Sequence, residues 1–312
     1  MVKADAYNHG LEGVAKISER IVDRYGVATI EEAVSLRRLG IRKPISIFSY
    51  ECKNVKEIKR YDVTPVVYSI ETFREIEKNN VKDFEIKIDS GMNRFGFKCQ
   101  DEIRLLFQLM YEHKTKPRAI HTHFYSPKSV FEQTNRFEQV ILPYYKQLGG
   151  VKRILSATTG LLHGVIKDGV RIGLEAYKGA LKVTSKILSI KPVFVGETIG
   201  YDGKYQTNND TKVAIVSGGY YDGIRQEYSG MQVFLNNRAT RIVGRICMDT
   251  TIIDVGSVEA SVGDEVIIID SNNLINVKKQ YALTDYEIIT SIKGRAKRTY
   301  TYNGQKYNPR TN

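Results

Sequence analysis

The sequence predicts an α/β fold: a TIM-type (β/α)8 barrel followed by a mostly antiparallel β domain. Up to residue 178, short runs rich in β-branched residues alternate with longer segments of helical spacing, which is typical of βαβ units in a parallel sheet. Beyond residue 178, strand-like runs follow one another without long helices, which indicates an antiparallel domain. We therefore expect a barrel domain over residues 1–178 and a β domain over residues 179–312.

In the barrel domain, seven runs read as strands: Gly26–Ile30, Pro44–Ser49, Val63–Tyr68, Phe84–Asp89, Ala119–Phe124, Arg153–Ser156 and Val170–Leu174. Helical spacing is found over Glu31–Leu39, Ile70–Lys78, Asp101–Tyr111 and Val130–Gln147. Met1–Ala4, followed by a helical segment over Leu11–Tyr25, reads as the end of an eighth strand. Eight βα units fit a TIM barrel; a doubly wound sheet, which usually has fewer strands, is the alternative.

In the β domain, turn signals such as Asp202-Gly203 and Asn236-Asn237 separate the strand-like runs. The expected strands are Leu181–Ile190, Thr211–Val216, Met231–Leu235, Ile242–Ile246, Thr251–Val255 and Glu265–Ile269.

Composition narrows the class of protein. Of the 312 residues, 42% are hydrophobic and 26% are charged, which excludes wholesale disorder. The apolar runs are far shorter than the roughly 18 residues of a spanning helix, and no secretory signal follows Met1, so we expect no membrane partner. The three cysteines lie far apart, without the spacing of a metal site or a disulfide framework, which indicates a reducing cytoplasm and no metal.

The net charge of +12 raises the hypothesis of a nucleic-acid binder. However, six basic residues and no acidic residue lie in Ile292–Asn312. We expect that segment to be a solvated or frayed terminus. Because no nucleic-acid motif accompanies the charge, we expect no nucleic-acid partner.

Several residues that suggest a site lie where the predicted strands end, which is where barrels carry their chemistry. They are Lys3, Arg94, His123, the loop Ser156-Ala157-Thr158-Thr159-Gly160, Arg171 and Gly173. A lysine at a barrel mouth can form a Schiff base with an aldehyde, and a hydroxyl- and glycine-rich loop can bind phosphate; together they point to pyridoxal phosphate. The alternatives are a surface Lys3, an Arg94 paired with Asp89 and a core His123.

Six motifs, in order and at similar spacing, give the chain a resemblance to a known family. They are Val2-Lys3-Ala4-Asp5-Ala6-Tyr7-Asn8-His9-Gly10, Lys87-Ile88-Asp89-Ser90-Gly91-Met92-Asn93-Arg94, Thr122-His123-Phe124, Arg171-Ile172-Gly173, Gly219-Tyr220-Tyr221-Asp222-Gly223 and Gly244-Arg245-Ile246-Cys247-Met248-Asp249. Over about residues 1–300 the chain resembles the alanine racemases, pyridoxal-phosphate enzymes of fold type III. The resemblance implies interconversion of L-alanine and D-alanine by a homodimer that supplies cell-wall peptidoglycan.

The resemblance also implies residue roles. Lys3 matches the lysine that holds pyridoxal phosphate and acts as one acid/base group, and Tyr220 matches the second base, which acts in the partner subunit's site. Arg94 and Met248 match residues near the substrate carboxylate. Arg171, oriented by His123, matches the arginine at the pyridine nitrogen. Further cofactor contacts are implied for Tyr7, Thr159, Gly173 and Tyr286, and Lys87 matches a lysine that is carbamylated in some members.

The chain departs from the family pattern at several positions. Asn8 replaces a usual glycine, Thr158-Thr159 replaces Asn-Ser, and Lys178 is inserted in a Tyr-Gly pair. The family also has a strand, a helix and the body of the first barrel strand ahead of Lys3, so we expect a truncated first strand and a poorly folded or weakly active chain.

Two alternatives remain within this chemistry. One is a racemase for serine or another amino acid; Tyr286, at the implied entrance, favours a small substrate such as alanine. The other is a weakly active or non-catalytic pyridoxal-phosphate-binding relative. Non-catalytic proteins of this type lack the β domain and the Gly-Tyr-x-Asp-Gly motif, both of which this chain has.

Overall fold

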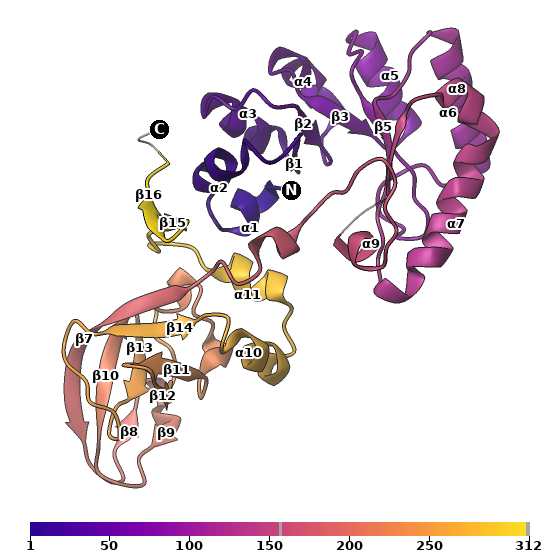
Figure 1. Ribbon diagram of the computed structural model, residues 1–312. Helices are drawn as coiled ribbons and strands as arrows, with labels where there is room; N and C mark the ends of the chain where they lie inside the picture. The colour runs from indigo at the N-terminus through magenta and orange to yellow at the C-terminus, as the bar shows by residue number, and fades with distance from the viewer. Residues whose placement is uncertain (156–157, 310–312) are drawn as a thin grey trace. The chain divides into compact units, whose positions relative to one another are not determined.

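Six short parallel strands form the central sheet of the first part of the chain, in the same order in space as in sequence. They are β1 (Tyr25–Val27), β2 (Ile45–Ile47), β3 (Thr64–Val67), β4 (Glu85–Lys87), β5 (Ala119–Thr122) and β6 (Lys152–Leu155). The structure is a computed structural model that describes residues 1–155 and 158–309 (Figure 1). The sheet is curled like half of a barrel, so the predicted α/β barrel class is confirmed, with six regular strands among the described residues.

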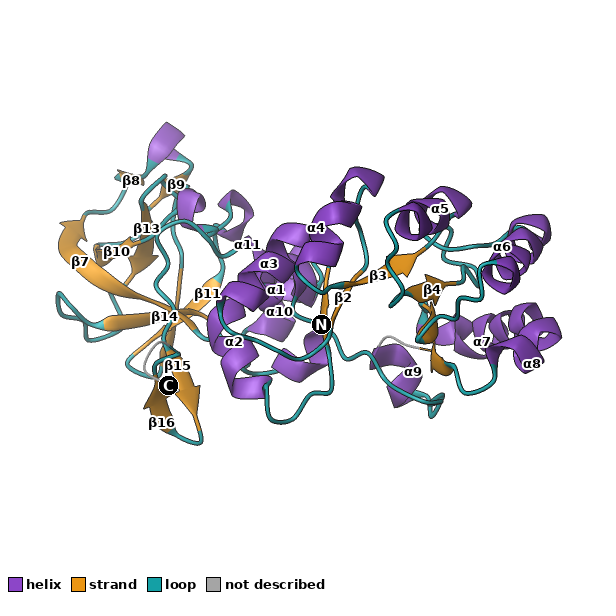
Figure 2. Cartoon of the chain, turned by 90° about the horizontal axis from the view of Figure 1, so that it is seen from above, coloured by secondary structure: helices purple, strands orange, loops and turns teal. Residues whose placement is uncertain are grey.

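Helices connect these strands, and α5, α6 and α7 lie along one side of them (Figure 2). The helices are α2 (Leu11–Ser18), α3 (Ile30–Arg38), α4 (Val55–Arg60), α5 (Ile70–Lys78), α6 (Gln100–Glu112), α7 (Val130–Ile141), α8 (Tyr145–Leu148) and α9 (Thr158–Leu162). The long helix expected over Val130–Gln147 ends early because Pro143 cannot continue it. The expected helix over Leu11–Tyr25 likewise ends at Ser18.

The segments at the two edges of the sheet are irregular. Beside β1, the amide of Val2 donates to the carbonyl of Gly26 at 2.9 Å; beyond β6, the amide of Asp168 donates to the carbonyl of Arg153 at 3.1 Å. The nitrogen of Met1 donates to Ile172 at 2.9 Å, which joins the two segments. The strand expected over Val170–Leu174 is therefore wrong. The Asp168 carboxylate takes the amide of Arg153 at 2.8 Å, so a side chain replaces a ladder bond.

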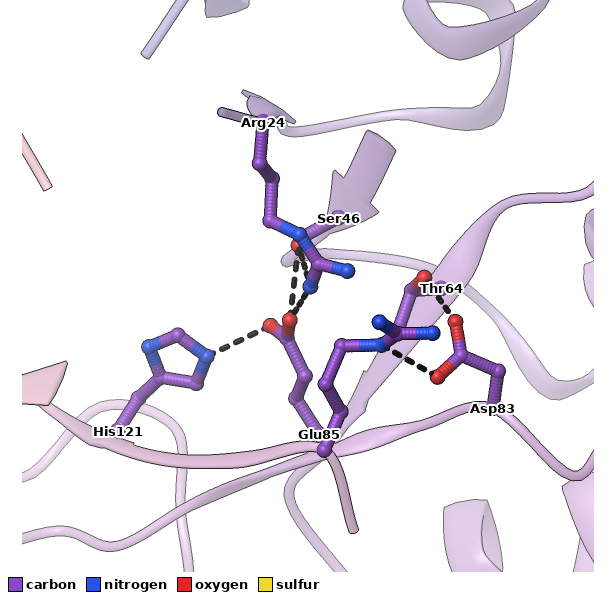
Figure 3. Close-up of polar contacts among 7 residues, drawn as sticks. Arg24, Ser46, Thr64, Asp83, Glu85 and His121 are labelled. Atoms are coloured by element: carbon purple, nitrogen blue, oxygen red, sulfur yellow. Dashed lines mark hydrogen bonds and ion pairs between the residues drawn. The ribbon is translucent and has the colours of Figure 1, made fainter. Parts of the chain in front are cut away.

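A buried polar cluster lies inside the sheet (Figure 3). Glu85 on β4 is fully buried; one of its oxygens pairs with Arg24 and accepts from Ser46 at 3.2 Å, and the other lies 2.6 Å from Nε2 of His121. Burial, together with the charge of Arg171, holds the pKa of His121 well below its usual range. The imidazole is therefore neutral, with Nε2 donating to the carboxylate.

The second part of the chain forms a six-stranded antiparallel sheet in the order β12-β11-β14-β7-β10-β13. Its strands are β7 (Val183–Val193), β10 (Thr211–Ser217), β11 (Gln232–Leu235), β12 (Arg238–Arg241), β13 (Thr250–Asp254) and β14 (Glu265–Ile269). Between β7 and β10 in the sequence, β8 (Thr198–Ile199) and β9 (Tyr205–Gln206) form a separate antiparallel pair. The predicted antiparallel β domain is confirmed.

The strand expected over Ile242–Ile246 is wrong. Asn236 and Asn237 both adopt positive φ in a two-residue turn, which sets the register of β11 and β12 by pairing Leu235 with Arg238. The strand therefore ends at Arg241. Two helices were also not expected in this domain, α10 (Leu274–Tyr281) and α11 (Asp285–Ser291).

The described chain divides into two compact units, and each unit is built from more than one stretch of the sequence. Residues 7–9 group with residues 177–299, and residues 300–309 group with the barrel. There, β15 (Tyr300–Tyr302) and β16 (Gln305–Tyr307) form a hairpin. The basic segment from Ile292 onward is solvated as expected, because residues 293–299 and 301–306 are exposed. Its described part is not frayed, since Arg295 and Arg298 are bonded to Asp222 and Asn8.

Candidate active site

Lys3 begins a turn of left-handed backbone, α1 (Lys3–Tyr7). The residues from Ala4 to Asn8 all have φ between 52° and 66°. Left-handed turns cost L-residues roughly 1–2 kcal/mol each, so this geometry persists only because surrounding contacts impose it. The amide of Ala6 donates to Val2 at 2.9 Å, and the Asp5 carboxylate accepts from the amide of Leu11 at 2.7 Å. The turn fixes Lys3 at the end of the segment beside β1.

Glu32 supports this turn from helix α3. One of its oxygens accepts from the amide of Ala4 at 2.6 Å, and the other accepts from the amide of Ala28 at 2.8 Å. Glu32 also completes the capping box of α3 with Thr29. A single side chain therefore joins the helix start to the residue after Lys3.

A cluster of cations surrounds the end of β4. Burial, then the charges of Arg94 and Arg171, lower the pKa of Lys3. Burial and the same two arginines lower the pKa of Lys87 to about 7. Asp89 and Glu32 act in the opposite direction without cancelling the effect. The site therefore has an excess of positive charge and a lysine that loses its proton more easily than a surface lysine.

Arg171 and His123 are held together. Arg171 Nη2 donates to Nδ1 of His123 at 2.7 Å, since a guanidinium can only donate. The guanidinium carbon lies 4.5 Å from the centre of the Phe48 ring. The His123 carbonyl accepts from Gln133 at 3.1 Å. His123 thus has a fixed tautomer and orients Arg171.

Asp89 shapes the turn that carries Arg94. Its Oδ1 accepts from the amides of Gly91 at 2.9 Å and Asn93 at 3.1 Å. Among the residues that the structure describes, no ion pair joins Asp89 to Arg94, so the alternative that Arg94 merely neutralises Asp89 is not supported. Arg94 is exposed at the end of this turn.

The expected phosphate loop begins outside the described residues, because Ser156 and Ala157 are not described. Thr158 and Thr159 open the short helix α9. The amide of Gly173 donates to the hydroxyl of Thr158 at 3.4 Å. This contact brings the loop and the segment that carries Arg171 together within one unit.

The other unit contains a group of tyrosine rings. The ring of Tyr7 lies 5.4 Å from that of Tyr177 and 5.8 Å from that of Tyr286, measured between centroids. Asn8 adopts φ 66°, a conformation that asparagine tolerates, and its amide donates to the carbonyls of Ile289, at 2.9 Å, and Ile292. The change from glycine to Asn8 therefore adds contacts without losing the turn.

Tyr220 and Tyr221 lie in the loop Gly219–Gly223, also within this unit. The amide of Tyr220 donates to Cys247 at 3.0 Å, and that of Tyr221 donates to Met248 at 3.2 Å. Tyr220 and Met248, which the sequence places 28 residues apart, thus lie on bonded loops. Their side chains are half exposed, with 42% and 52% of their surface accessible.

Comparisons with known proteins now decide the family. Residues 1–180 match the model of the alanine racemase N-terminal domain and residues 180–300 that of the C-terminal domain. An alanine racemase from Aquifex aeolicus is 32% identical over 320 residues, which cover 96% of this chain and 90% of the relative. The chain belongs to the alanine racemase family.

Solved structures of alanine racemases share the fold. One from Clostridium difficile superposes with a TM-score of 0.90 at 28% identity, covering 98% of this chain and 89% of the other. One from Bartonella henselae, with covalently bound pyridoxal phosphate, has a TM-score of 0.85 at 25% identity, covering 96% and 91%. This racemase is therefore an amino-acid isomerase of a family that binds pyridoxal phosphate.

The donor set of the racemase fits that cofactor. The excess positive charge around Lys3 suits an anionic ligand, and a lysine with lowered pKa supplies the amine that an aldehyde needs. Within the described ranges, no group of three His, Cys, Asp or Glu side chains could hold a metal ion. No described helix is long and apolar enough to cross a membrane.

Sequence reasoning missed three supporting residues of the racemase. The sequence could have indicated Glu32 only as part of a capping box, because Thr29 and Glu32 have that spacing at the start of a helix. Phe48 and Arg295 carry no motif. Their partners lie far along the chain, so only the fold reveals them.

Proposed function

We propose that the protein interconverts L-alanine and D-alanine with pyridoxal phosphate, using Lys3 and Tyr220 of the partner subunit as two acid/base groups. The observation that carries the proposal is the cationic cluster at the end of β4, in which Lys3 has a lowered pKa beside Arg94 and Arg171. A lowered pKa makes the neutral amine of Lys3 easier to reach, and a neutral amine can accept the Cα proton of an amino acid. Racemisation needs a second group on the opposite face, and Tyr220 takes that role.

The residues divide the work. Lys3 removes or returns the proton on one face of Cα, and Tyr220 does the opposite on the other, so one proton leaves and one arrives in each turnover. Pyridoxal phosphate, when bound, delocalises the electron pair left on Cα. Arg94 supplies the cation that binds the substrate carboxylate, and Met248 would contact the same carboxylate.

The remaining residues would hold the cofactor. Arg171, fixed by His123, would donate to the ring nitrogen; because a guanidinium cannot accept a proton, it would leave that nitrogen unprotonated. Tyr7, Thr159, Gly173 and Tyr286 would bind the phosphate or narrow its site. Among possible substrates, small amino acids are favoured by the tyrosine at position 286.

The wider assignment follows from this chemistry. A site that uses Tyr220 of the partner subunit requires a homodimer. Apart from residues 7–9 and 300–309, which group with the other unit, we assign residues 1–178 to the cofactor-holding barrel and residues 179–312 to the domain that supplies Tyr220. D-alanine made in the cytoplasm would serve peptidoglycan synthesis. The alternative substrate is serine, whose hydroxyl is the only addition to the alanine side chain.

The test is a coupled assay for D-amino acids, run on L-alanine, L-serine and a basic amino acid. We expect turnover on alanine, yellow protein when the cofactor is bound, and a colourless Lys3→Ala variant with activity reduced by more than about a thousandfold, because the lysine both holds the cofactor and moves the proton. Lys16→Ala, on helix α2, is the control for losing a lysine. Turnover on serine alone, or an active Lys3→Ala variant, would contradict the proposal.

A further inference from the structure

The loop that carries Tyr220 is wedged between two other segments of the same unit. On one side, besides the two tyrosine amides, the amide of Gly218 donates to Asp249 at 2.8 Å. On the other side, the amide of Lys293 donates to Asp222 at 3.0 Å. A side chain at Gly219 would overlap the carbonyls of Cys247 and Met248, and one at Gly223 would overlap that of Ser291. The loop is therefore in backbone contact with both neighbours.

Arg295 connects all three segments through its side chain. Its Nε and Nη2 donate to the two oxygens of Asp222 at 3.0 and 2.8 Å, and its backbone amide donates to the same carboxylate at 3.1 Å. Its Nη1 lies 2.9 Å from Oδ1 of Asp249. The guanidinium carbon lies 5.1 Å from the centre of the Tyr221 ring. One guanidinium thus contacts two residues of the tyrosine loop, Asp222 and Tyr221, and one of the Met248–Asp249 loop.

Burial and hydrogen bonding have opposite effects on the pKa of Asp222. Burial alone would raise the pKa of Asp222, but bonds from Arg295 and the amide of Gly219 lower it. Asp222 and Asp249 raise the pKa of Arg295. Each partner of the Asp222–Arg295 pair therefore favours the charged form of the other.

The contacts also separate the two tyrosines. The Arg295 guanidinium lies against the ring of Tyr221, which stays 56% exposed, whereas the described residues provide no ring or hydrogen-bonding partner for the side chain of Tyr220. A tyrosine that must reach a substrate needs a free hydroxyl on a fixed backbone. Tyr220 meets both conditions.

We propose that Arg295 is a positioning residue for racemisation: it locks the Tyr220 loop onto the Met248–Asp249 loop, so that the second base and the substrate-binding side chain keep one relative geometry. The inference rests on the proposed role of Tyr220. Arginine is needed because its planar fork pairs with one carboxylate by two bonds and reaches a second carboxylate as well. A lysine in its place can satisfy only part of this set.

The test compares racemisation with exchange of the Cα proton for deuterium in D2O, starting from each enantiomer of alanine. Lys3 can exchange the proton on its own face without inversion, whereas inversion also needs Tyr220. Misplacing a catalytic group by about 1 Å costs on the order of a hundredfold. We expect Arg295→Lys to lower kcat for racemisation by about tenfold to a hundredfold, with KM changed less than about twofold.

In the same variant, exchange without inversion should persist for one enantiomer, so the ratio of exchange to racemisation rises. Lys297→Met is the matched control, because Lys297 is exposed in the same segment and the structure shows no ion pair for it among the described residues. This control should leave the ratio unchanged. If Arg295→Lys does not fold, Asp249→Asn tests the same link, since the Arg295–Asp222 bonds remain.

The outcomes separate the inference from the proposed function. If Arg295→Lys, or Asp249→Asn in its place, lowers exchange and racemisation equally, or changes neither, the positioning role is overturned. If Tyr220→Phe itself leaves the ratio unchanged, the proposed role of Tyr220 fails. A raised ratio in Tyr220→Phe and in the Arg295 or Asp249 variant, but not in Lys297→Met, supports the inference.

Discussion

At the scale of single residues, Asn8 shows how a positive φ is stabilised by side-chain hydrogen bonds. A positive φ is costly for most side chains, but asparagine tolerates it, and here the amide also satisfies backbone carbonyls of Ile289 and Ile292 at the end of α11. Arg298 then bonds the oxygen of the same side chain at 2.6 Å. Asn8 therefore ties the left-handed turn to two other segments.

This arrangement predicts that Asn8→Ala lowers the free energy of unfolding more than Asn8→Gly does. Asn8→Ala removes the side-chain bonds and keeps the strained φ, so we expect the free energy of unfolding to fall by about 2–3 kcal/mol. Asn8→Gly also removes the bonds but relieves the backbone, so the loss should be about 1 kcal/mol. Urea unfolding of both variants measures the difference. Equal losses would show that the backbone conformation carries no cost here.

At the scale of elements, the buried cluster of Glu85, Arg24 and His121 places charge where parallel strands usually have none. Arg24 precedes β1, Glu85 lies on β4 and His121 on β5, so these side chains link β4 and β5 to the segment before β1 (Figure 3). His121 stays neutral in the folded protein because its pKa is lowered.

That lowered pKa predicts a pH dependence of stability. Below about pH 6.5 the unfolded chain protonates this histidine and the folded protein does not, so the unfolded state binds more protons. The free energy of unfolding should therefore fall as the pH falls from about 6.5, with a slope from this group of up to about 1.4 kcal/mol per pH unit. Urea unfolding of His121→Phe between pH 5 and 7.5 should show a shallower slope than the unaltered protein. Parallel slopes would contradict the assignment.

Elements with strong local signals were predicted best. The helix expected over Ile70–Lys78 is found with those bounds, because Ser69 caps it and its apolar residues Phe73 and Ile76 lie on one buried face. Glu265–Ile269 is likewise a strand as expected. The strand predicted over Val170–Leu174 is absent. An apolar run does not reveal that the Asp168 carboxylate will accept the hydrogen bond from the amide of Arg153, which a neighbouring strand would otherwise accept.

The site was predictable in part for the same reason. Lys3 and His123 lie at the ends of predicted strands, and strand ends meet at one edge of a parallel sheet; Arg171 was found through its motif, since the strand predicted around it is absent. Contacts of Arg295 with Asp222, 73 residues away, and of Glu32 with Ala4, 28 residues away, depend on the assembled fold. A sequence pattern does not contain that information unless both partners belong to known motifs.

At the scale of the whole molecule, the proposed sharing of a site between subunits predicts complementation. Lys3→Ala and Tyr220→Phe should each reduce racemisation by at least about a hundredfold. A mixed dimer would pair the intact Lys3 of one subunit with the intact Tyr220 of the other, so random mixing should restore about a quarter of full activity. Co-expression and the alanine assay measure it.

The control for complementation is co-expression of Lys3→Ala with Lys3→Met, which offers no intact lysine and should restore nothing. If the mixed Lys3 and Tyr220 variants form dimers and stay inactive, Tyr220 does not act across an interface. Activity of Tyr220→Phe on its own would instead remove this tyrosine from the chemistry.

The division of the chain into units has a further consequence, for recombination between related genes. The chain passes between the two units four times, at 6/7, 9/10, 176/177 and 299/300. A single crossover near residue 178 would therefore import a foreign C-terminal half while keeping the native Tyr7 and Asn8, which contact Tyr286 and Ile289 of that half. Chimeras should inherit function only when residues 7–9 and 177–299 are exchanged as one block, so this enzyme is a poor subject for modular shuffling despite having two units.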